Sequence, residues 1–377
     1  MTVDALAHLK DPERVSAIVL KIGSALLVDA EGEPREQWLS GLVDEVADFQ
    51  KRGIGVILVS SGAIALGAAR LGLDNGGRGS LADAQAAASV GQISLAGLWS
   101  VALERNGLSA AQMLVTLGDL EDRRRYLNAS STLSRLLEAG VVPVVNENDS
   151  VATEEIRFGD NDRLAARVAQ AAGADAVVLL SDVDGLYDGD PSDPHAKLVS
   201  RIEGVGPKVL AMGTSNSSSG KGSGGMASKL QAAQIAERAG ITLAIINGKH
   251  VAPISTSIAE DRGSLFIPRR SDDARRAWLG GRIAPSGSIS VDDGCIAALA
   301  KGASLLSAGV TDVEGSFDRG ALVSVLDSDG MAIAQGLVEY DADSCRSIAG
   351  LRQSEQAEIL GHAPRSAVIH RDQMVML

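Results

Sequence analysis

The chain has 377 residues, of which 45% are hydrophobic, and its formal net charge is −13. This length exceeds one ordinary hydrophobic core and favours two domains. The acidic balance argues against a general nucleic-acid binder, and no apolar run is expected to be long enough to span a membrane. Residues 1–14 lack the apolar core of a signal peptide, so a cytoplasmic protein is expected.

Five short runs rich in Val, Ile and Leu each end in a small or polar cluster: 17–20, 56–59, 141–145, 176–180 and 243–246. Short apolar runs without alternation are typical of parallel strands that are buried on both faces. In open α/β sheets, ligands bind outside the carboxyl ends of the strands. The sequence therefore predicts that one edge of the sheet carries Lys21, Ser61, Asp149 and Asp182.

Helical stretches alternate with these strands. Trp38, Leu42, Val46 and Phe49 recur at helical spacing within 35–52, and 82–105, 122–139, 162–172 and 226–239 are also expected to be helical. Segment 108–116 is a further strand candidate, and 150–158 resembles an exposed hairpin. This alternation predicts a three-layer αβα domain with a mostly parallel sheet.

Two low-complexity or breaker-rich segments interrupt this pattern. The Gly/Ser-rich run 213–225 predicts a loop that precedes a helix and could close over a phosphate. A Gly/Pro/Arg-rich change in composition predicts a linker at 276–285, after a first domain at 1–275. Short strand-like runs at 289–291, 321–326 and 331–338 then predict a small β-rich domain at 286–377.

A dinucleotide-binding motif and a metal-ligand cluster are both unsupported by the surrounding sequence. Residues 220–225 have the spacing G-x-G-x-x-G, but a Ser-rich loop precedes them where a dinucleotide site needs a strand. The two cysteines and five histidines have no metal-ligand spacing, so no protein metal site is expected.

Several polar residues, spread along the sequence, together form a candidate ligand-binding site. Lys21 ends a strand beside Gly23, and Ser60-Ser-Gly opens a helix, although a surface lysine and a plain helix cap are the ordinary alternatives. The tetrads at 146–149 and 159–162 are rich in acids and amides, which are costly to bury without a polar ligand. Lys229 adds a second cation. Two lysines, a bridging carboxylate and many donors suit phosphoryl transfer.

Taken together, these segments resemble the glutamate 5-kinases, within the amino acid kinase family. The resemblance rests on 19–24, 59–64, 146–150, 158–162, 180–187 and 224–229, and residues 285–377 resemble a PUA domain. It implies a transferase, a kinase that moves the γ-phosphate of ATP to the side-chain carboxylate of L-glutamate, the first step of proline biosynthesis. Family members use Mg²⁺ held largely by the phosphates, are inhibited by proline and are usually homo-oligomers.

The resemblance also implies residue roles. Catalysis would rest on Lys21, Lys229 and Asp162, with the carboxylate holding the two lysines. Glutamate would be bound by Ser61, Asp149 and Asn161. ATP would be bound by Lys21, Ser181, Asp182, Ser223, Gly224, Gly225, Met226, Ala227, Ser228 and Lys229.

There are three alternatives, of which a catalytically inactive regulatory protein is disfavoured because every expected phosphate-site residue is present. Another member of the amino acid kinase family would share the fold and the phosphate residues. An RNA-binding protein would act through the PUA-like domain, but residues 285–377 contain six Lys or Arg against thirteen Asp or Glu. Because nucleic-acid affinity depends mainly on Lys and Arg, RNA binding is not expected.

Overall fold

The structure is a computed structural model, and it describes residues 2–29, 32–151, 160–190, 193, 195–215, 225–269 and 285–376. The chain divides into two compact units, Met1–Glu121 with Ala129–Ser271 and Asp122–Asn128 with Asp272–Leu377. Almost all of the predicted hairpin at 150–158, and the predicted linker except residue 285, lie outside the described residues. The domain limits drawn from the sequence therefore stay predictions.

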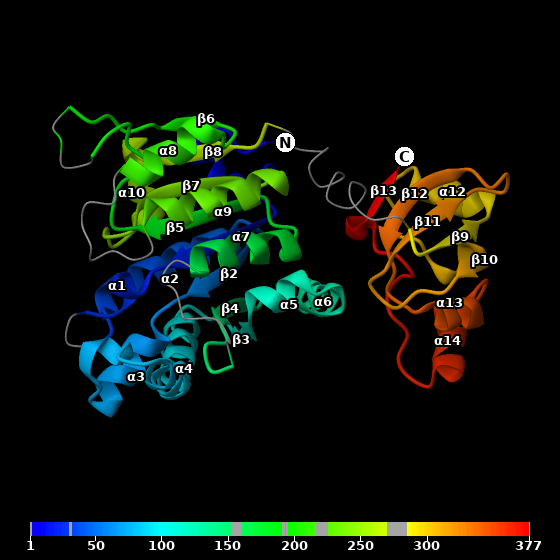
Figure 1. Cartoon of the computed structure of the whole chain (residues 1–377), viewed down its shortest axis with the longest axis horizontal. Coiled ribbons are helices and arrows are strands. Elements are labelled where there is room, and N and C mark those ends of the chain that lie inside the picture. The colour runs from blue at the N-terminus through cyan, green and yellow to red at the C-terminus, as the bar shows by residue number, and fades with distance from the viewer. Residues whose placement is uncertain are drawn as a thin grey trace. The chain divides into compact units, whose positions relative to one another are not determined.

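The first unit contains an eight-stranded sheet with the order β3-β4-β2-β1-β5-β7-β8-β6 (Figure 1). Its strands are β1 (Ala17–Ile22), β2 (Gly55–Ser60), β3 (Ala110–Val115), β4 (Val142–Glu147), β5 (Ala176–Ser181), β6 (Arg201–Glu203), β7 (Thr242–Asn247) and β8 (Ser264–Ile267). Six neighbouring strands are parallel, while β8 runs antiparallel to β7 and parallel to β6. The prediction of a mostly parallel sheet is confirmed.

Helices contact both faces of this sheet, and the alternation of side chains along β1 shows how the faces differ. Ile18, Leu20 and Ile22 belong to the core cluster that includes Trp38 and Leu42 of α2 (Glu36–Lys51). The same cluster includes residues of α4 (Leu81–Glu104) and α10 (Pro253–Glu260). Contacts to the sheet also come from α7 (Asp160–Ala172) and α9 (Met226–Arg238). The alternate β1 positions, which include Lys21, therefore point away from the α2 face.

Helices α3 (Ala63–Leu71) and α4 pack with their backbones in direct contact. A Cβ atom at Gly67 would lie 1.8 Å from the carbonyl oxygen of Ala87, and one at Gly91 would lie 1.8 Å from that of Ala63. Only glycine permits this approach. Ala84, Ala87 and Ala88 of α4 form one buried cluster with Ile64 and Ala68 of α3.

The expectation that no segment has the length for a membrane span needs correction. Helix α4 has 24 residues and is apolar enough to cross a membrane by length and composition alone. The core helix of a globular protein passes the same test. The contact with α3 accounts for Ala87 and Gly91, while Ile93 and Val101 of α4 are exposed.

The predicted loop at 213–225 begins later than expected. Helix α8 (Pro207–Ser215) continues through its first three residues, and residues 216–224 lie outside the described part. A Cβ atom at Gly213 would lie 2.6 Å from Cδ1 of Leu230, so this glycine lets α8 approach α9 closely. The remaining helices of this region are α1 (Ser24–Leu27), α5 (Leu117–Glu121) and α6 (Arg123–Glu138).

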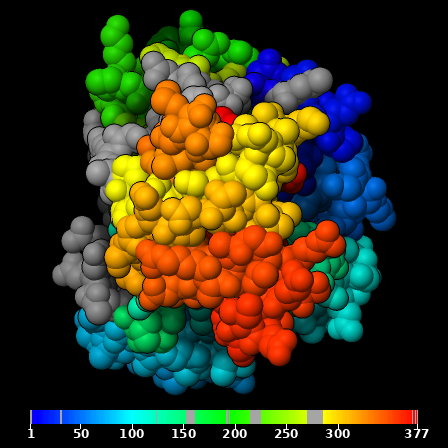
Figure 2. All heavy atoms as spheres, turned by 90° about the vertical axis from the view of Figure 1, so that its right-hand side faces the viewer, coloured from blue at the N-terminus to red at the C-terminus, as the bar shows by residue number. Residues whose placement is uncertain are grey.

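The second unit contains a five-stranded sheet with the order β10-β9-β11-β12-β13. Its strands are β9 (Gly287–Val291), β10 (Val310–Gly315), β11 (Leu322–Leu326), β12 (Ala332–Leu337) and β13 (Met374–Met376), and its helices are α12 (Asp293–Leu299), α13 (Ala342–Ile348) and α14 (Gln353–Leu360). Figure 2 shows one face of these residues, from yellow to red, as a continuous packed surface. A separate core cluster that includes Ile289, Val323 and Ile348 stabilises this unit. The predicted small β-rich fold is confirmed.

Candidate active site

The carboxyl ends of neighbouring strands bring the predicted site residues to one edge of the first sheet. In spatial order, β4, β2, β1 and β5 are adjacent. Asp149 follows β4, Ser61 follows β2, Lys21 lies one residue before the end of β1, and Asp182 follows β5. The fold thus places side chains that are far apart in the sequence on one edge, where open α/β sheets bind ligands.

Two lysines share one buried carboxylate at this edge. Nζ of Lys21 lies 2.7 Å from Oδ1 of Asp162, and Nζ of Lys229 lies 3.0 Å from Oδ2 of the same residue. Asp162 is 0% exposed and Lys21 is 7% exposed. The three side chains come from α7, β1 and α9. With two cations and one anion, the group keeps one unit of positive charge for an anionic ligand.

Burial and mutual attraction act in opposite directions on the pKa values of this group. Burial lowers the pKa of Lys21 below its ordinary 10.5, while Asp162 opposes this shift and Lys229 adds to it. Burial alone would raise the pKa of Asp162, but Lys21 and Lys229 hold it below the ordinary 3.8. At neutral pH the Asp162 carboxylate is therefore ionised and holds both amines in place.

Helix α9 presents its N-terminus beside Lys229. Gly225 is its N-cap, and Met226, Ala227, Ser228 and Lys229 form its first turn. The N-terminus of a helix favours anions because of the helix dipole, and the lysine adds a full charge. Ser223 and Gly224, which the sequence also assigned to ATP, lie outside the described residues.

Ser61 and Asn161 lie together next to the lysine pair. Gly62 has a φ of +121°, a conformation that favours glycine, and it turns the chain sharply between β2 and α3. Nδ2 of Asn161 donates to Oγ of Ser61 at 2.6 Å and to Oδ1 of Asn146 at 3.1 Å. Among the described residues, Oδ1 of Asn161 is buried and has no hydrogen-bond partner. A buried orphan acceptor at this place calls for a ligand donor.

Asp149 lies in the turn after β4 and is half-buried. Arg78 is close enough to feel its charge: burial lowers the pKa of the Arg78 guanidinium, and Asp149 opposes that shift. Arg78 was not among the residues singled out from the sequence. Its loop, between α3 and α4, has no motif that would have identified it.

Ser181 is the last residue of β5, which pairs with β1, and Asp182 follows it. Oγ of Ser181 donates to Oδ1 of Asp182 at 3.3 Å, and the Asp182 carboxylate raises the pKa of Lys21, against the larger effect of burial. This electrostatic coupling places Asp182 within range of the lysine pair. The two residues assigned to ATP are thus near the cation that would meet its phosphates.

Asp184 holds the segment that follows β5. Its carboxylate accepts hydrogen bonds from Asn247 Nδ2 at 2.8 Å, Arg262 Nε at 2.8 Å and Tyr187 Oη at 3.1 Å. Burial would raise the pKa of Asp184, but these donors hold it below 3.8. Asn247 and Arg262 lie 63 and 78 residues from Asp184 along the chain, so no spacing in the sequence identified this group.

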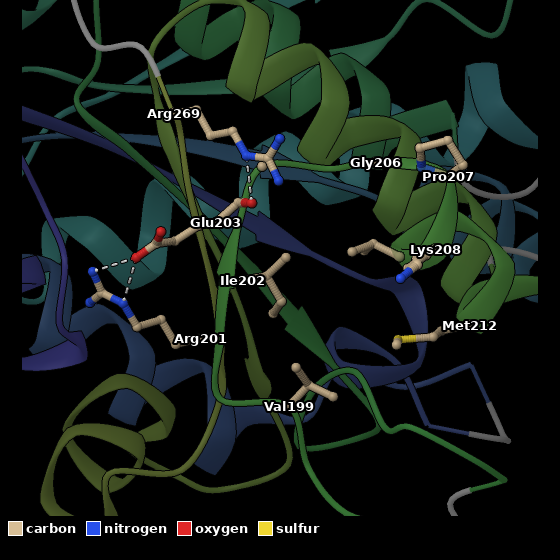
Figure 3. Close-up of a pocket in the computed structure, with 11 residues that line it drawn as sticks. Val199, Arg201, Ile202, Glu203, Gly206, Pro207, Lys208, Met212 and Arg269 are labelled. Atoms are coloured by element: carbon tan, nitrogen blue, oxygen red, sulfur yellow. Dashed lines mark hydrogen bonds and ion pairs between the residues drawn. The ribbon is translucent and has the colours of Figure 1, made fainter.

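A cavity of about 650 Å³ lies between β6 and α8 (Figure 3). Val199, Ile202 and Met212 give it apolar walls, and Arg201, Lys208 and Arg269 give it cations. The carboxylate of Glu203 pairs with Arg201 at 3.3 Å, and the carbonyl of Glu203 accepts from Arg269 Nε at 2.9 Å. None of the site residues predicted from the sequence lines it, so the cavity is separate from the lysine pair.

The described residues hold no group of three or more His, Cys, Asp or Glu side chains that could bind a metal ion. Oxygen atoms are the ligands that hard divalent cations such as Mg²⁺ prefer. The positive lysine pair and the N-terminus of α9 fit a polyphosphate, which carries such oxygens.

Comparisons with known proteins agree with this chemistry. Residues 16–247 match the family model described as "Amino acid kinase family", and residues 287–360 match "PUA domain". A glutamate 5-kinase of Novosphingobium aromaticivorans is 61% identical over 377 residues, which is 100% of both chains. Those of Sphingopyxis alaskensis and Zymomonas mobilis are 56% and 52% identical, over 97% of this chain and 99% and 92% of their own.

Proposed function

Since this chain belongs to the amino acid kinase family and carries a PUA domain, we propose that it acts as a glutamate 5-kinase. The reaction transfers the γ-phosphate of ATP to the side-chain carboxylate of L-glutamate. The products are ADP and L-glutamyl 5-phosphate, an acyl phosphate that enters proline biosynthesis.

One observation carries the chemical part of this proposal: two lysines share the fully buried carboxylate of Asp162 at the carboxyl edge of the sheet. The obstacle to the reaction is repulsion between the glutamate carboxylate and the triphosphate. A buried pair of cations, fixed before the ligands arrive, offsets that repulsion most where charge spreads over the moving phosphoryl group.

The bond changes need no general base. The side-chain carboxylate of glutamate is already ionised at neutral pH. One of its oxygens forms a bond to the γ-phosphorus as the bond from that phosphorus to the bridging oxygen of ADP breaks. Lys21 and Lys229 stabilise the charge on the oxygens of the transferring group, while Ser181 and Asp182 lie where the nucleotide would be held.

Mg²⁺, when bound, would shield the charge of the triphosphate. Phosphate oxygens would be its main ligands, as the resemblance to the glutamate 5-kinases implies. The amino acid substrate would lie against Ser61, Asp149 and Asn161. Asp149 supplies a negative charge for the α-ammonium group, and the orphan acceptor of Asn161 supplies a second polar partner.

Hydroxylamine trapping tests the proposal directly. An acyl phosphate reacts with hydroxylamine to give a coloured hydroxamate, which should form only when L-glutamate, ATP and Mg²⁺ are all present. L-Aspartate and N-acetyl-L-glutamate are matched controls, because they change the chain length or block the ammonium group. Equal rates with either control would contradict the assignment.

Proline inhibition, a homo-oligomeric state and a cytoplasmic location rest on the family resemblance, and they stay predictions. RNA binding through the PUA domain is the second candidate. The excess of seven acidic residues in 285–377 does not favour it.

A further inference from the structure

Helix α4 supports the substrate side of the site through two polar side chains. Nε1 of Trp99 donates to Oγ of Ser60 at 2.8 Å, and Oε1 of Gln92 accepts from Nδ2 of Asn146 at 2.9 Å. Trp99 is fully buried and Asn146 is 2% exposed. Neither Gln92 nor Trp99 is a predicted substrate residue, yet each holds a residue that lies next to one.

The three amide side chains of Gln92, Asn146 and Asn161 form a chain with a direction. Each amide has one acceptor oxygen and one donor nitrogen. Gln92 uses its oxygen to accept from the nitrogen of Asn146, which leaves the oxygen of Asn146 to accept from the nitrogen of Asn161. That nitrogen also donates to Ser61.

This direction decides what Asn161 offers to a ligand. Its nitrogen donates two hydrogen bonds within the protein, while its oxygen is buried and lacks a hydrogen-bond partner among the described residues. The site therefore needs a donor from the ligand. If the direction of these hydrogen bonds were reversed, the oxygen of Asn161 would accept a hydrogen bond from Asn146. The nitrogen of Asn161 would then need an acceptor from the ligand.

We propose that Gln92 is a positioning residue that fixes the direction of this amide chain, so that Oδ1 of Asn161 accepts a hydrogen bond from the α-ammonium group of the substrate. This inference rests on the proposed function. Of the polar groups on glutamate, only the ammonium donates at neutral pH, because both carboxylates are ionised acceptors. Gln92 thus contributes to the recognition of an amino acid rather than a simple dicarboxylic acid, without touching it.

Three substitutions at position 92 distinguish the effect of hydrogen-bond direction from the effect of side-chain shape. Gln92→Met keeps an unbranched side chain but removes both amide atoms. Gln92→Glu keeps only acceptors, so it preserves the direction. Gln92→Lys offers only donors, so it opposes the direction. Gln50→Met is the matched control, because Gln50 is a half-buried glutamine in the last turn of α2, distant in sequence from the site.

The readout is the ratio of kcat/KM for L-glutamate to kcat/KM for glutarate, which is glutamate without its ammonium group. We expect Gln92→Met and Gln92→Lys to lower this ratio about tenfold, the worth of one hydrogen bond to a charged group. The change should lie in KM for glutamate, with kcat and KM for ATP nearly unchanged. Gln92→Glu and Gln50→Met should keep the ratio within about threefold of the original.

Two results would overturn the proposal. One is an unchanged ratio in both Gln92→Met and Gln92→Lys. The other is an equal loss of glutamate and glutarate activity in every variant at position 92, which would show a purely structural role. If Gln92→Met fails to fold by circular dichroism, the comparison of Gln92→Glu with Gln92→Lys decides the question. Absence of hydroxamate from the unaltered enzyme would instead refute the proposed function itself.

Discussion

Nζ of Lys21 lies 2.7 Å from Oδ1 of Asp162, and both side chains are buried. The ammonium comes from a central strand and the carboxylate from a helix on the face opposite α2. Burying either charge alone would cost several kcal/mol. The pair is tolerated because each partner satisfies the other, and Lys229 adds a second cation to the same carboxylate.

Removing either lysine should affect turnover more than substrate affinity. Lys21→Ala and Lys229→Ala are each expected to lower kcat by roughly a hundredfold or more, because the cations matter most as the phosphoryl group moves. KM for glutamate should change little. Steady-state kinetics with Lys51→Ala, an exposed lysine at the end of α2, give the control. If a variant of Lys21 or Lys229 kept a nearly normal kcat, that lysine would not be catalytic.

The lowered pKa of Lys21 predicts a pH limit for activity. Lys21 must be protonated to stabilise the phosphoryl group, and burial brings its pKa below 10.5. The value of kcat should therefore fall on the alkaline side before pH 10.5 is reached. In Lys21→Arg, the guanidinium stays charged in this range, so the residual activity should no longer decline there. If the alkaline decline in kcat persists unchanged in Lys21→Arg, the decline is caused by the titration of a group other than Lys21.

Asp162 should make stability depend on pH in the acid range. Its folded pKa is held below 3.8 by the two lysines, so the unfolded state binds its proton first as the pH falls. The stabilisation from Asp162 is thus complete above about pH 4 and is lost as the pH falls through the lower folded value. Urea denaturation at pH 7 and pH 3 should show a smaller loss of stability for Asp162→Asn than for the unaltered protein. An equal loss would mean that the folded structure does not hold the pKa of Asp162 below its unfolded value.

Asp149 and Asp162 should have different kinetic effects. Asp149→Ala is expected to raise KM for glutamate strongly, because the ammonium group of the substrate loses its charged partner. Asp162→Ala should instead lower kcat, since it releases both lysines. Initial rates across a range of glutamate concentrations separate the two effects. The opposite pattern would exchange the two roles.

Asp184 is expected to hold the nucleotide segment in place. Asp184→Asn weakens the charge-assisted hydrogen bonds from Arg262 and Tyr187, so KM for ATP should rise about tenfold with little change in KM for glutamate. Asp188→Asn is the matched control, because Asp188 is exposed and accepts from the backbone N–H of Lys197. A similar rise in both variants would deny Asp184 a specific role.

Most of the strands and part of the candidate site could be predicted from the amino-acid sequence alone. Apolar runs without alternation predicted β1, β2, β4, β5 and β7, because strands buried on both faces need apolar side chains throughout. Amphipathic spacing predicted α2 in the same way. The polar clusters at the ends of these strands named Lys21, Ser61, Asp149 and Asp182, since parallel strands bring their carboxyl ends to one edge.

Which side chains contact one another could not be predicted in this way. Three sets of contacts join segments that are distant in the chain. Lys21 and Lys229 both pair with Asp162. Asp184 accepts hydrogen bonds from Asn247 and Arg262, and Gln92 accepts one from Asn146. Such contacts leave no periodicity in the sequence, because hydrogen bonds depend on distance and direction in space rather than on spacing along the chain. The direction of the hydrogen bonds between Gln92, Asn146 and Asn161 is set only once strand β4, helix α4 and helix α7 have packed together.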